Sequence, residues 1–219
     1  MPNSRKQTNR FIFMPFNSAC LLSLAGVTAS VFSMILSVRG MLELALVGLV
    51  LAGLADLFDG ALARRLKLNK FEKEYGVQLD TVIDAVSFVA TPVVIALSAG
   101  LTTFPMFVGL ALFVVAGVLR LAHFNTLSRR GQASPTHHRG LPVTYTALIL
   151  PLAFLFQATL TVEAFHLLLA LLFPFIGLLF VVNVPIRKPR GIFYIILPLL
   201  AVGLIAYWVQ QFLLTSGGA

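Results

Sequence analysis

All four aspartates of the chain fall between positions 56 and 84: Asp56, Asp59, Asp80 and Asp84. The remaining acids are four glutamates among 219 residues. Carboxylates gathered in one small volume repel one another and lose hydration, so they need protons or a cation. Hard oxygen ligands suit Mg²⁺, Mn²⁺ or Ca²⁺. Four carboxylates are enough for two such ions, and paired metal ions favour in-line displacement at phosphorus.

The spacing of these aspartates predicts two helical stripes. At about 100° per residue, Asp56 and Asp59 lie on one face of a helix, while Asp80 and Asp84, four residues apart, lie on one face of the next. Small residues continue both stripes: Gly60, Ala63 and Gly76. They leave room for a bulky ligand, although small residues also let membrane helices pack closely. We favour the ligand interpretation for these residues and the packing interpretation for Gly53.

The helices that carry the aspartates must lie in a membrane. Hydrophobic residues make up 58% of the chain, charged residues only 11%, and the mean hydropathy is +0.94. A soluble domain carries about 25% charged residues, and a membrane-spanning helix needs about 20 apolar ones. Seven runs qualify: 17–38, 41–64, 77–100, 103–127, 141–161, 164–185 and 191–214. These long runs do not alternate like barrel strands, so we expect an all-α, polytopic bundle of about seven transmembrane helices.

Basic residues predict how these helices are oriented. Fifteen of the sixteen lysines and arginines lie before the first run, or on or near alternate connections, and only Arg39 falls on the other side. The positive-inside rule then places the N-terminus and the aspartates at the cytoplasmic face of an inner membrane, and the C-terminus outside. The net charge of +8 should face anionic headgroups and phosphate-bearing substrates. We expect no nucleic acid partner, because no basic soluble module is present.

The runs predict a single domain. We expect a basic cytoplasmic arm at 1–16, one transmembrane domain at 17–214 and a short tail at 215–219. The first run is too long for a cleaved signal peptide and is followed by further spans, so we interpret it as an anchor. One cysteine, Cys20, excludes an internal disulfide or a cysteine metal cluster, and we interpret it as a packing residue.

Two other roles for the aspartates stay open at this point. Salt bridges with nearby arginines and lysines would account for one or two carboxylates, but not for four on helical stripes beside small residues. A transporter of metal ions or protons also uses acids inside the membrane. Transport predicts acids at mid-membrane and broken helices in corresponding halves of a repeat. Here the acids lie toward one end of their helices, and we find no repeat.

The segment from Asp56 to Arg64 reads D-L-F-D-G-A-L-A-R, and that from Gly76 to Asp84 reads G-V-Q-L-D-T-V-I-D. Together they resemble the signature of the CDP-alcohol phosphotransferases, D-x-x-D-G-x-x-A-R followed by G-x-x-x-D-x-x-x-D, and every fixed position is filled. The interval between the two halves is a few residues longer than expected, in a loop where insertion is tolerated. The resemblance implies a six-helix catalytic core, here with an extra C-terminal helix.

Members of that family join a CDP-linked donor to an alcohol and release CMP. The resemblance implies that Asp56, Asp59 and Asp80 bind one Mg²⁺ or Mn²⁺ ion, that Asp56, Asp80 and Asp84 bind or approach a second, and that Asp84 is the base. It also implies which residues border the cytidine diphosphate: Gly60, Ala63, Arg64 and Gly76. Arg64 could equally be an anchor at the cytoplasmic face. The resemblance further suggests a homodimer among membrane lipids.

Flanking residues are similar to the phosphatidylserine synthase branch of the family. Three segments and one residue carry this similarity: Leu79–Phe88, Leu119–Asn125, Gly140–Pro142 and Asn17. It implies transfer of a phosphatidyl group from CDP-diacylglycerol to L-serine. The alternatives are the same chemistry with glycerol phosphate, inositol phosphate or another small alcohol, and a metal-ion or proton transporter.

The chain departs from that branch where the acceptor pocket is expected. His123 stands in place of an arginine, and Thr144 in place of a proline; Val89 and Thr91 also differ. The candidates for holding the acceptor or a lipid phosphate are Asn17, Arg120, His123, Asn125 and Arg139. Each could instead be an interfacial anchor. We expect His137 and His138 to be solvated loop residues.

Overall fold

The computed structural model describes residues 17–130, 137–187 and 192–216. The described part contains eight α-helices: α1 (Ser18–Val38), α2 (Leu42–Ala63), α3 (Lys70–Asp84), α4 (Thr91–Ser98), α5 (Phe104–Arg129), α6 (Thr146–Phe154), α7 (Val162–Val181) and α8 (Phe193–Ser216). Three short helical segments join them: the π-helix η1 (Ala85–Ala90) and the 3₁₀ helices η2 (Val143–Tyr145) and η3 (Leu155–Ala158).

The predicted all-α membrane bundle is confirmed. Six helices of the described part are long and apolar enough to cross a membrane, and the apolar helix Val143–Ala158 is shorter. That shorter helix occupies the predicted run 141–161. The third span begins earlier than predicted, at Lys70, because α3, η1 and α4 form one continuous helix ending at Ser98. The proposed arm, 1–16, lies outside the described residues.

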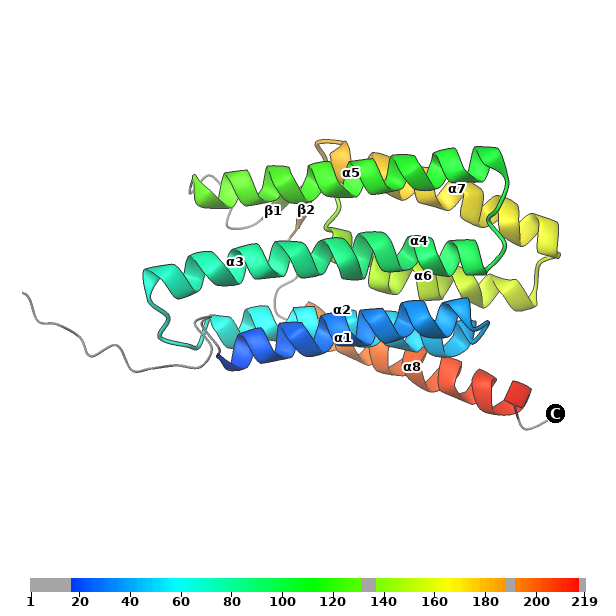
Figure 1. Cartoon of the computed structure of the whole chain (residues 1–219), viewed down its shortest axis with the longest axis horizontal. Helices are drawn as coiled ribbons and strands as arrows, with labels where there is room; N and C mark the ends of the chain where they lie inside the picture. Colours follow the sequence, from blue (N-terminus) through cyan, green and yellow to red (C-terminus); the bar gives the residue numbers. More distant parts are fainter. Residues whose placement is uncertain (1–16, 131–136, 188–191, 217–219) are drawn as a thin grey trace, which may run out of the picture.

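The helices form layers that run side by side along the bundle (Figure 1). The α3–η1–α4 helix lies in the middle, with α1 and α2 on one side of it and α5 on the other. Helix α7 packs on α5, and α8 packs on α2. The buried core joins these layers through aromatic contacts, such as Phe113 against Phe173 and Phe180.

Helices α1 and α2 approach each other closely because small residues line their contact. A Cβ added at Gly26 would lie 3.0 Å from the Cβ of Ala55, and one added at Gly48 would lie 2.9 Å from the Cβ of Ser33. Such contacts replace the hydrophobic driving force that is missing between helices in lipid. This close packing brings polar residues of α1 to the aspartate face of α2.

Helix α3 begins with a capping box and continues into a π-helix. Asn69 and Glu72 form a capping box: the Asn69 side chain accepts from the Glu72 backbone N–H at 2.9 Å, and the Glu72 carboxylate accepts from the Asn69 N–H at 2.8 Å. The π-helix η1 follows directly after Asp84. Pro92, which lacks a backbone N–H, stands at the beginning of α4 and prevents regular α-helical bonding one turn earlier.

The segment that leads into η2 is hydrogen-bonded to the end of α7 and to the residues that follow it. Two short strands pair antiparallel, β1 (His137–Arg139) with β2 (Pro185–Arg187). Sequence analysis did not predict these strands. The Gly140 N–H then donates to the Val184 carbonyl at 2.9 Å, and the Leu141 N–H donates to the Leu179 carbonyl at 2.9 Å. The segment Gly140–Pro142 is thereby held against the end of α7, and it delivers η2 to the aspartate end of the bundle.

Candidate active site

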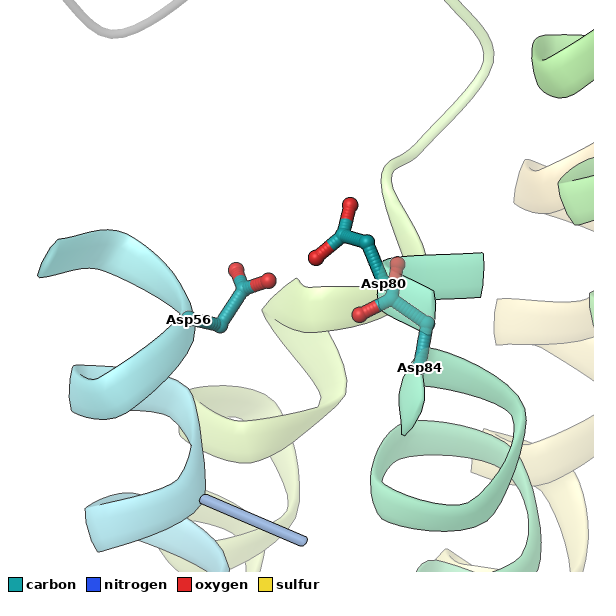
Figure 2. A group of neighbouring side chains, drawn as sticks. All are labelled: Asp56, Asp80 and Asp84. Atoms are coloured by element: carbon teal, nitrogen blue, oxygen red, sulfur yellow. The ribbon is translucent and has the colours of Figure 1, made fainter. Parts of the chain in front are cut away.

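Three of the aspartates converge between two helices. Asp56 extends from α2 toward Asp80 and Asp84, which extend from α3 (Figure 2). One carboxylate oxygen from each lies within 4.8 Å of the others. Three carboxylates at this separation offer oxygen ligands suited to a divalent cation. We call Asp56, Asp80 and Asp84 the aspartate triad.

The Asp84 carboxylate is the most enclosed of the triad. Asp84 is 9% exposed, and its Oδ1 atom is buried with no hydrogen-bond partner among the described residues. A buried, unpaired carboxylate oxygen is costly unless a cation or a proton compensates it. No salt bridge to any aspartate occurs within the described part of the chain, where the ion pair found is Lys70–Glu74. The donor set and the orphaned oxygen therefore fit Mg²⁺ or Mn²⁺ better than a structural ion pair.

Asp59 has a different partner from the triad. Its carboxylate Oδ2 accepts a hydrogen bond from the Ser23 hydroxyl of α1, and both residues are buried. Sequence reasoning predicted Asp59 as a metal ligand but missed Ser23. The sequence signal that could have identified Ser23 is its polar side chain on the inward face of the first span. Since Asp59 lines the same cavity as Asp56 and Asp80, its role as a ligand stays a prediction, and Ser23 orients its carboxylate.

Replacing Ser23 should change the metal requirement of the site. Ser23→Ala removes the hydroxyl that holds Asp59, and we expect the Mn²⁺ concentration for half-saturation of the site to rise by about tenfold, as for other lost partners of metal ligands. The matched control is Ser30→Ala, since Ser30 is fully buried on the same helix and donates only to the Gly26 carbonyl of its own helix. An unchanged Mn²⁺ requirement in Ser23→Ala, or an equal rise in Ser30→Ala, would contradict this role.

A cavity of about 600 Å³ opens beside Asp56 and Asp80. Most of the site residues predicted from the sequence line it: Asn17, Asp56, Asp59, Gly60, Ala63, Arg64, Gly76 and Asp80. Lys73 and Glu72 also line it, and sequence reasoning had assigned neither to the site. The spacing of Lys73, three residues before Gly76 on α3, was the signal that could have found it.

The glycines of the cavity are not required by packing. A Cβ added at Gly76 would meet no atom within 4 Å, and one added at Gly60 would meet only Nη1 of Arg64 at 3.7 Å. Gly53 differs, because a Cβ there would lie 2.7 Å from the Cβ of Ala147. The close contact at Gly53 fits the packing interpretation, while the ligand role of Gly60 and Gly76 stays a prediction.

Two further residues of the cavity have partners of their own. The Arg64 guanidinium donates to the Tyr194 hydroxyl of α8 at 3.5 Å. The Asn17 side chain caps α1, since its Oδ1 atom accepts from the Cys20 N–H at 3.0 Å. Both side chains still line the cavity, so neither contact removes them from the site.

Comparison with known proteins assigns the chain to a family. A family profile described as CDP-alcohol phosphatidyltransferase matches residues 16–214. The chain belongs to this family. Its similarity covers both aspartate-bearing helices and nearly all of the described bundle.

Curated relatives in the family carry related names. The archaetidylserine synthase of Methanothermobacter thermautotrophicus is 33% identical over 153 residues, which cover 68% of this chain and 60% of the relative. CDP-diacylglycerol–serine O-phosphatidyltransferases of Mycobacterium leprae and Saccharomyces cerevisiae are 34% and 38% identical over 127 and 106 residues. These two matches cover 58% and 45% of this chain, and 40% and 37% of the relatives. The chain thus spans 60% or less of these relatives' own length.

The other site residues that the sequence predicts for this chain lie away from the triad cavity. Arg120 donates from Nε to the Leu141 carbonyl at 3.3 Å, and with His123 it lines a separate cleft beside the end of α7. Asn125 is partly buried on α5, and its Oδ1 atom has no partner among the described residues. The Arg139 backbone pairs with Pro185 in the β1–β2 ribbon, but its side chain, like those of His137 and His138, lies outside the described part.

A second, smaller hollow also reaches the triad. It has a volume of about 90 Å³ and lies between α2, the η2–α6 segment and α8. Asp56, Thr144 and Tyr145 contribute its polar groups, and the remaining wall is apolar. Thr144, which departs from the family branch, therefore lies close to a triad carboxylate.

Proposed function

We propose that this chain transfers a phosphatidyl group from CDP-diacylglycerol to the hydroxyl of L-serine, giving phosphatidylserine and CMP. The observation that carries the proposal is the aspartate triad at the edge of a cavity lined by cations and small residues. The serine oxygen bonds to the phosphorus that bears diacylglycerol. The bond from that phosphorus to the bridging oxygen breaks, and CMP leaves with that oxygen.

The donor diphosphate lies beside the triad in this proposal. Two divalent ions, Mg²⁺ or Mn²⁺, would neutralise it and stabilise the attacking and leaving oxygens when bound by the aspartates. Arg64 and Lys73 contribute positive charge from the cavity wall, and Arg64 has the planar fork that suits phosphate oxygens. Gly60, Ala63 and Gly76 leave space for the cytidine.

Asp84 accepts the proton of the serine hydroxyl. A general base must lie within hydrogen-bond reach of the proton it takes, and Asp84 is the triad member with a buried, unpartnered oxygen. Asp56 and Asp80, each with a carboxylate oxygen within 4.8 Å of one of Asp84, serve as metal ligands. This division of roles follows the family signature residue by residue.

The choice of serine rests on charge and on the names of the relatives. Among the described residues that line the triad cavity, the cations are Arg64 and Lys73, and Glu72 offsets part of their charge. A phosphorylated acceptor would add two negative charges beside the donor diphosphate and would need more cations. The relatives described above are named for serine or archaetidylserine products. Asn17, which lines this cavity, is our candidate for contacting the acceptor.

Placement in the membrane completes the proposal. The basic connections and the triad lie at the same end of the bundle, so we assign the active site to the cytoplasmic face of the inner membrane. The N-terminus then lies inside and the C-terminus outside. Arg139 remains a candidate contact for lipid phosphate at that face, and a homodimer remains the expected assembly.

The direct test is CMP release by the purified chain in detergent with CDP-diacylglycerol and a panel of alcohols. We expect release with L-serine in Mg²⁺ or Mn²⁺, and loss of release by at least about 10²-fold after chelation of the metal. Release with glycerol phosphate or inositol phosphate, but not with serine, would reassign the acceptor. Ion flux in liposomes without CMP release would favour a transporter instead.

A further inference from the structure

The helix that carries Asp80 and Asp84 contains one irregular turn, the π-helix η1, directly after Asp84. At the end of this turn the Thr91 backbone N–H donates to the Val86 carbonyl, five residues earlier. A regular α-helix bonds to the residue four earlier, so the π-turn accommodates one more residue than an α-turn. Regular helix continues on both sides of it, in α3 and in α4.

The extra residue determines which way the aspartates face. Successive residues of an α-helix are rotated by about 100° about its axis, so a residue absorbed in a π-turn changes the relative facing of α3 and α4 by that angle. Helix α4 is held in place, because it packs on α1 and α2 and buries Ile95 and Ala96 completely. With α4 fixed, an uninterrupted α-helix would turn Asp84 about 100° away from its present direction, which is toward Asp56 (Figure 2).

Thr91 supplies a bond that a regular α-turn does not offer. Its hydroxyl Oγ1 donates to the Val86 carbonyl at 2.9 Å, also across five residues, and the residue is fully buried. Threonine hydroxyls in α-helices bond to the carbonyl three or four residues earlier, as Thr28 does in α1 with the Leu24 carbonyl at 2.8 Å. The Thr91 hydroxyl therefore stabilises the π-turn relative to the α-turn.

Pro92 acts in the same direction by disfavouring the regular alternative. It stands at the beginning of α4, directly after Thr91. In an uninterrupted α-helix its missing N–H would leave the Phe88 carbonyl without a hydrogen bond, and its ring would clash with that carbonyl. Two neighbouring residues thus favour the π-turn, one by stabilising it and the other by destabilising the α-turn.

We propose that η1 is the turn that aims the aspartates of α3 at Asp56, and that Thr91 is a positioning residue that holds this turn. The proposal rests on the metal-binding role proposed above for the aspartate triad. Thr91 lies outside the described lining of the triad cavity and acts through the helix, by fixing the facing of Asp80 and Asp84. When its hydroxyl is lost, the three carboxylates meet less often at the separation that a divalent ion requires.

The first test is Mn²⁺ binding to the full chain in detergent, followed by the electron paramagnetic resonance signal of free Mn²⁺. Thr91→Val keeps the shape of the side chain but removes the hydroxyl, and the Mn²⁺ dissociation constant should rise by about threefold, as for one lost hydrogen bond. Thr91→Ser retains the hydroxyl and should bind Mn²⁺ as the wild type does. The matched control is Thr28→Val, which removes a hydroxyl with an ordinary α-helical bond. Unchanged affinity in Thr91→Val, or equal weakening in Thr28→Val, would overturn the role of Thr91.

Deletions test the facing of the aspartates itself. Removing Ala90, an exposed residue of η1, makes Thr91 the fourth residue after Val86, so the same bonds would close a regular α-turn with α3 and α4 unmoved. This chain should bind Mn²⁺ nearly as tightly as the wild type. Removing Val94 from the regular helix α4 instead rotates α3 by about 100° relative to Ile95, and Mn²⁺ binding should weaken by at least about tenfold. Equal Mn²⁺ affinity in the two deletion variants would overturn the proposal.

Combining the two kinds of change separates positioning from packing. In the chain without Ala90 the turn is regular, and the hydroxyl is no longer needed to hold a π-turn. Thr91→Val should therefore not weaken Mn²⁺ binding in that chain. The same loss of affinity with and without Ala90 would show that Thr91 acts by local packing, and its positioning role would be wrong.

Failure of this proposal can be told apart from failure of the proposed reaction, because Mn²⁺ binding needs no CDP-diacylglycerol, no acceptor and no turnover. A chain that shows the expected pattern of Mn²⁺ affinities but releases no CMP would contradict only the reaction. A chain that releases CMP with serine, but whose variants all bind Mn²⁺ equally, would contradict only the positioning role of η1 and Thr91.

Discussion

Asp84→Asn should lower CMP release by about 10³-fold while the protein stays folded. The amide has nearly the volume of the carboxylate, so packing around this buried position is preserved. It cannot accept the proton of the acceptor hydroxyl, and it carries no charge for a divalent ion beside Asp56 and Asp80. The measurement is CMP release from CDP-diacylglycerol and serine, together with the thermal unfolding midpoint in detergent.

The matched control is Glu74→Gln on the same helix. Glu74 lies outside the triad cavity, and its ion pair with Lys70 joins two exposed side chains at 4.0 Å. An exposed pair of this kind contributes little to stability, so both activity and unfolding should stay near the wild-type values. Wild-type activity in Asp84→Asn would exclude Asp84 as the base. Loss of activity in Glu74→Gln would show that removing an acid from α3 is enough to abolish CMP release, whichever acid it is.

The convergence of the triad was predictable because it depends on local periodicity. Asp80 and Asp84 are one helical turn apart, so any helix through them presents both on one face. The short connection from Arg64 to Asn69 joins α2 to α3 at one end of the bundle, so the aspartates of both helices lie at that end. Long apolar runs predicted a helical membrane protein equally well, since a bilayer requires about 20 apolar residues per span.

Contacts between distant segments were not predictable in the same way. No spacing rule links Ser23 to Asp59, because their contact depends on how α1 rotates against α2. Close packing of small residues determines that rotation, as at Gly26 against Ala55. A serine on a membrane helix more often bonds to its own backbone, so sequence gives little reason to single out Ser23.

The contacts of Arg120 were not predictable for the same physical reason. Its position in the sequence motif suggested a contact with acceptor or lipid phosphate, which stays a prediction. The rotation of α5 is decided by Gly117, where an added Cβ would lie 2.8 Å from Cγ2 of Val89 in η1. With Gly117 against η1, Arg120 turns toward Leu141 and the end of α7. The motif singled out Arg120, but only the packing of α5 shows what this residue contacts.

Gly140→Ala should destabilise the fold by about 2 kcal/mol or more, the second large effect we expect. Gly140 has a φ of +76°, which L side chains rarely adopt, and an added Cβ would lie 2.7 Å from the Phe180 carbonyl oxygen. That oxygen belongs to the backbone of α7 and cannot turn away as a flexible side chain can. The expected result is a lower unfolding midpoint in detergent, with reduced CMP release because Gly140 leads into η2 beside Asp56.

Gly203→Ala provides the matched control for this substitution. Gly203 lies on α8, and a Cβ there would meet no atom within 4 Å. Alanine favours a helix over glycine by up to about 1 kcal/mol, so this variant should unfold at or slightly above the wild-type midpoint. If Gly140→Ala had the same unfolding midpoint as Gly203→Ala, the backbone at Gly140 would be free to move. The hydrogen bonds from Gly140 and Leu141 to the end of α7 would then not be needed to hold η2 beside the triad.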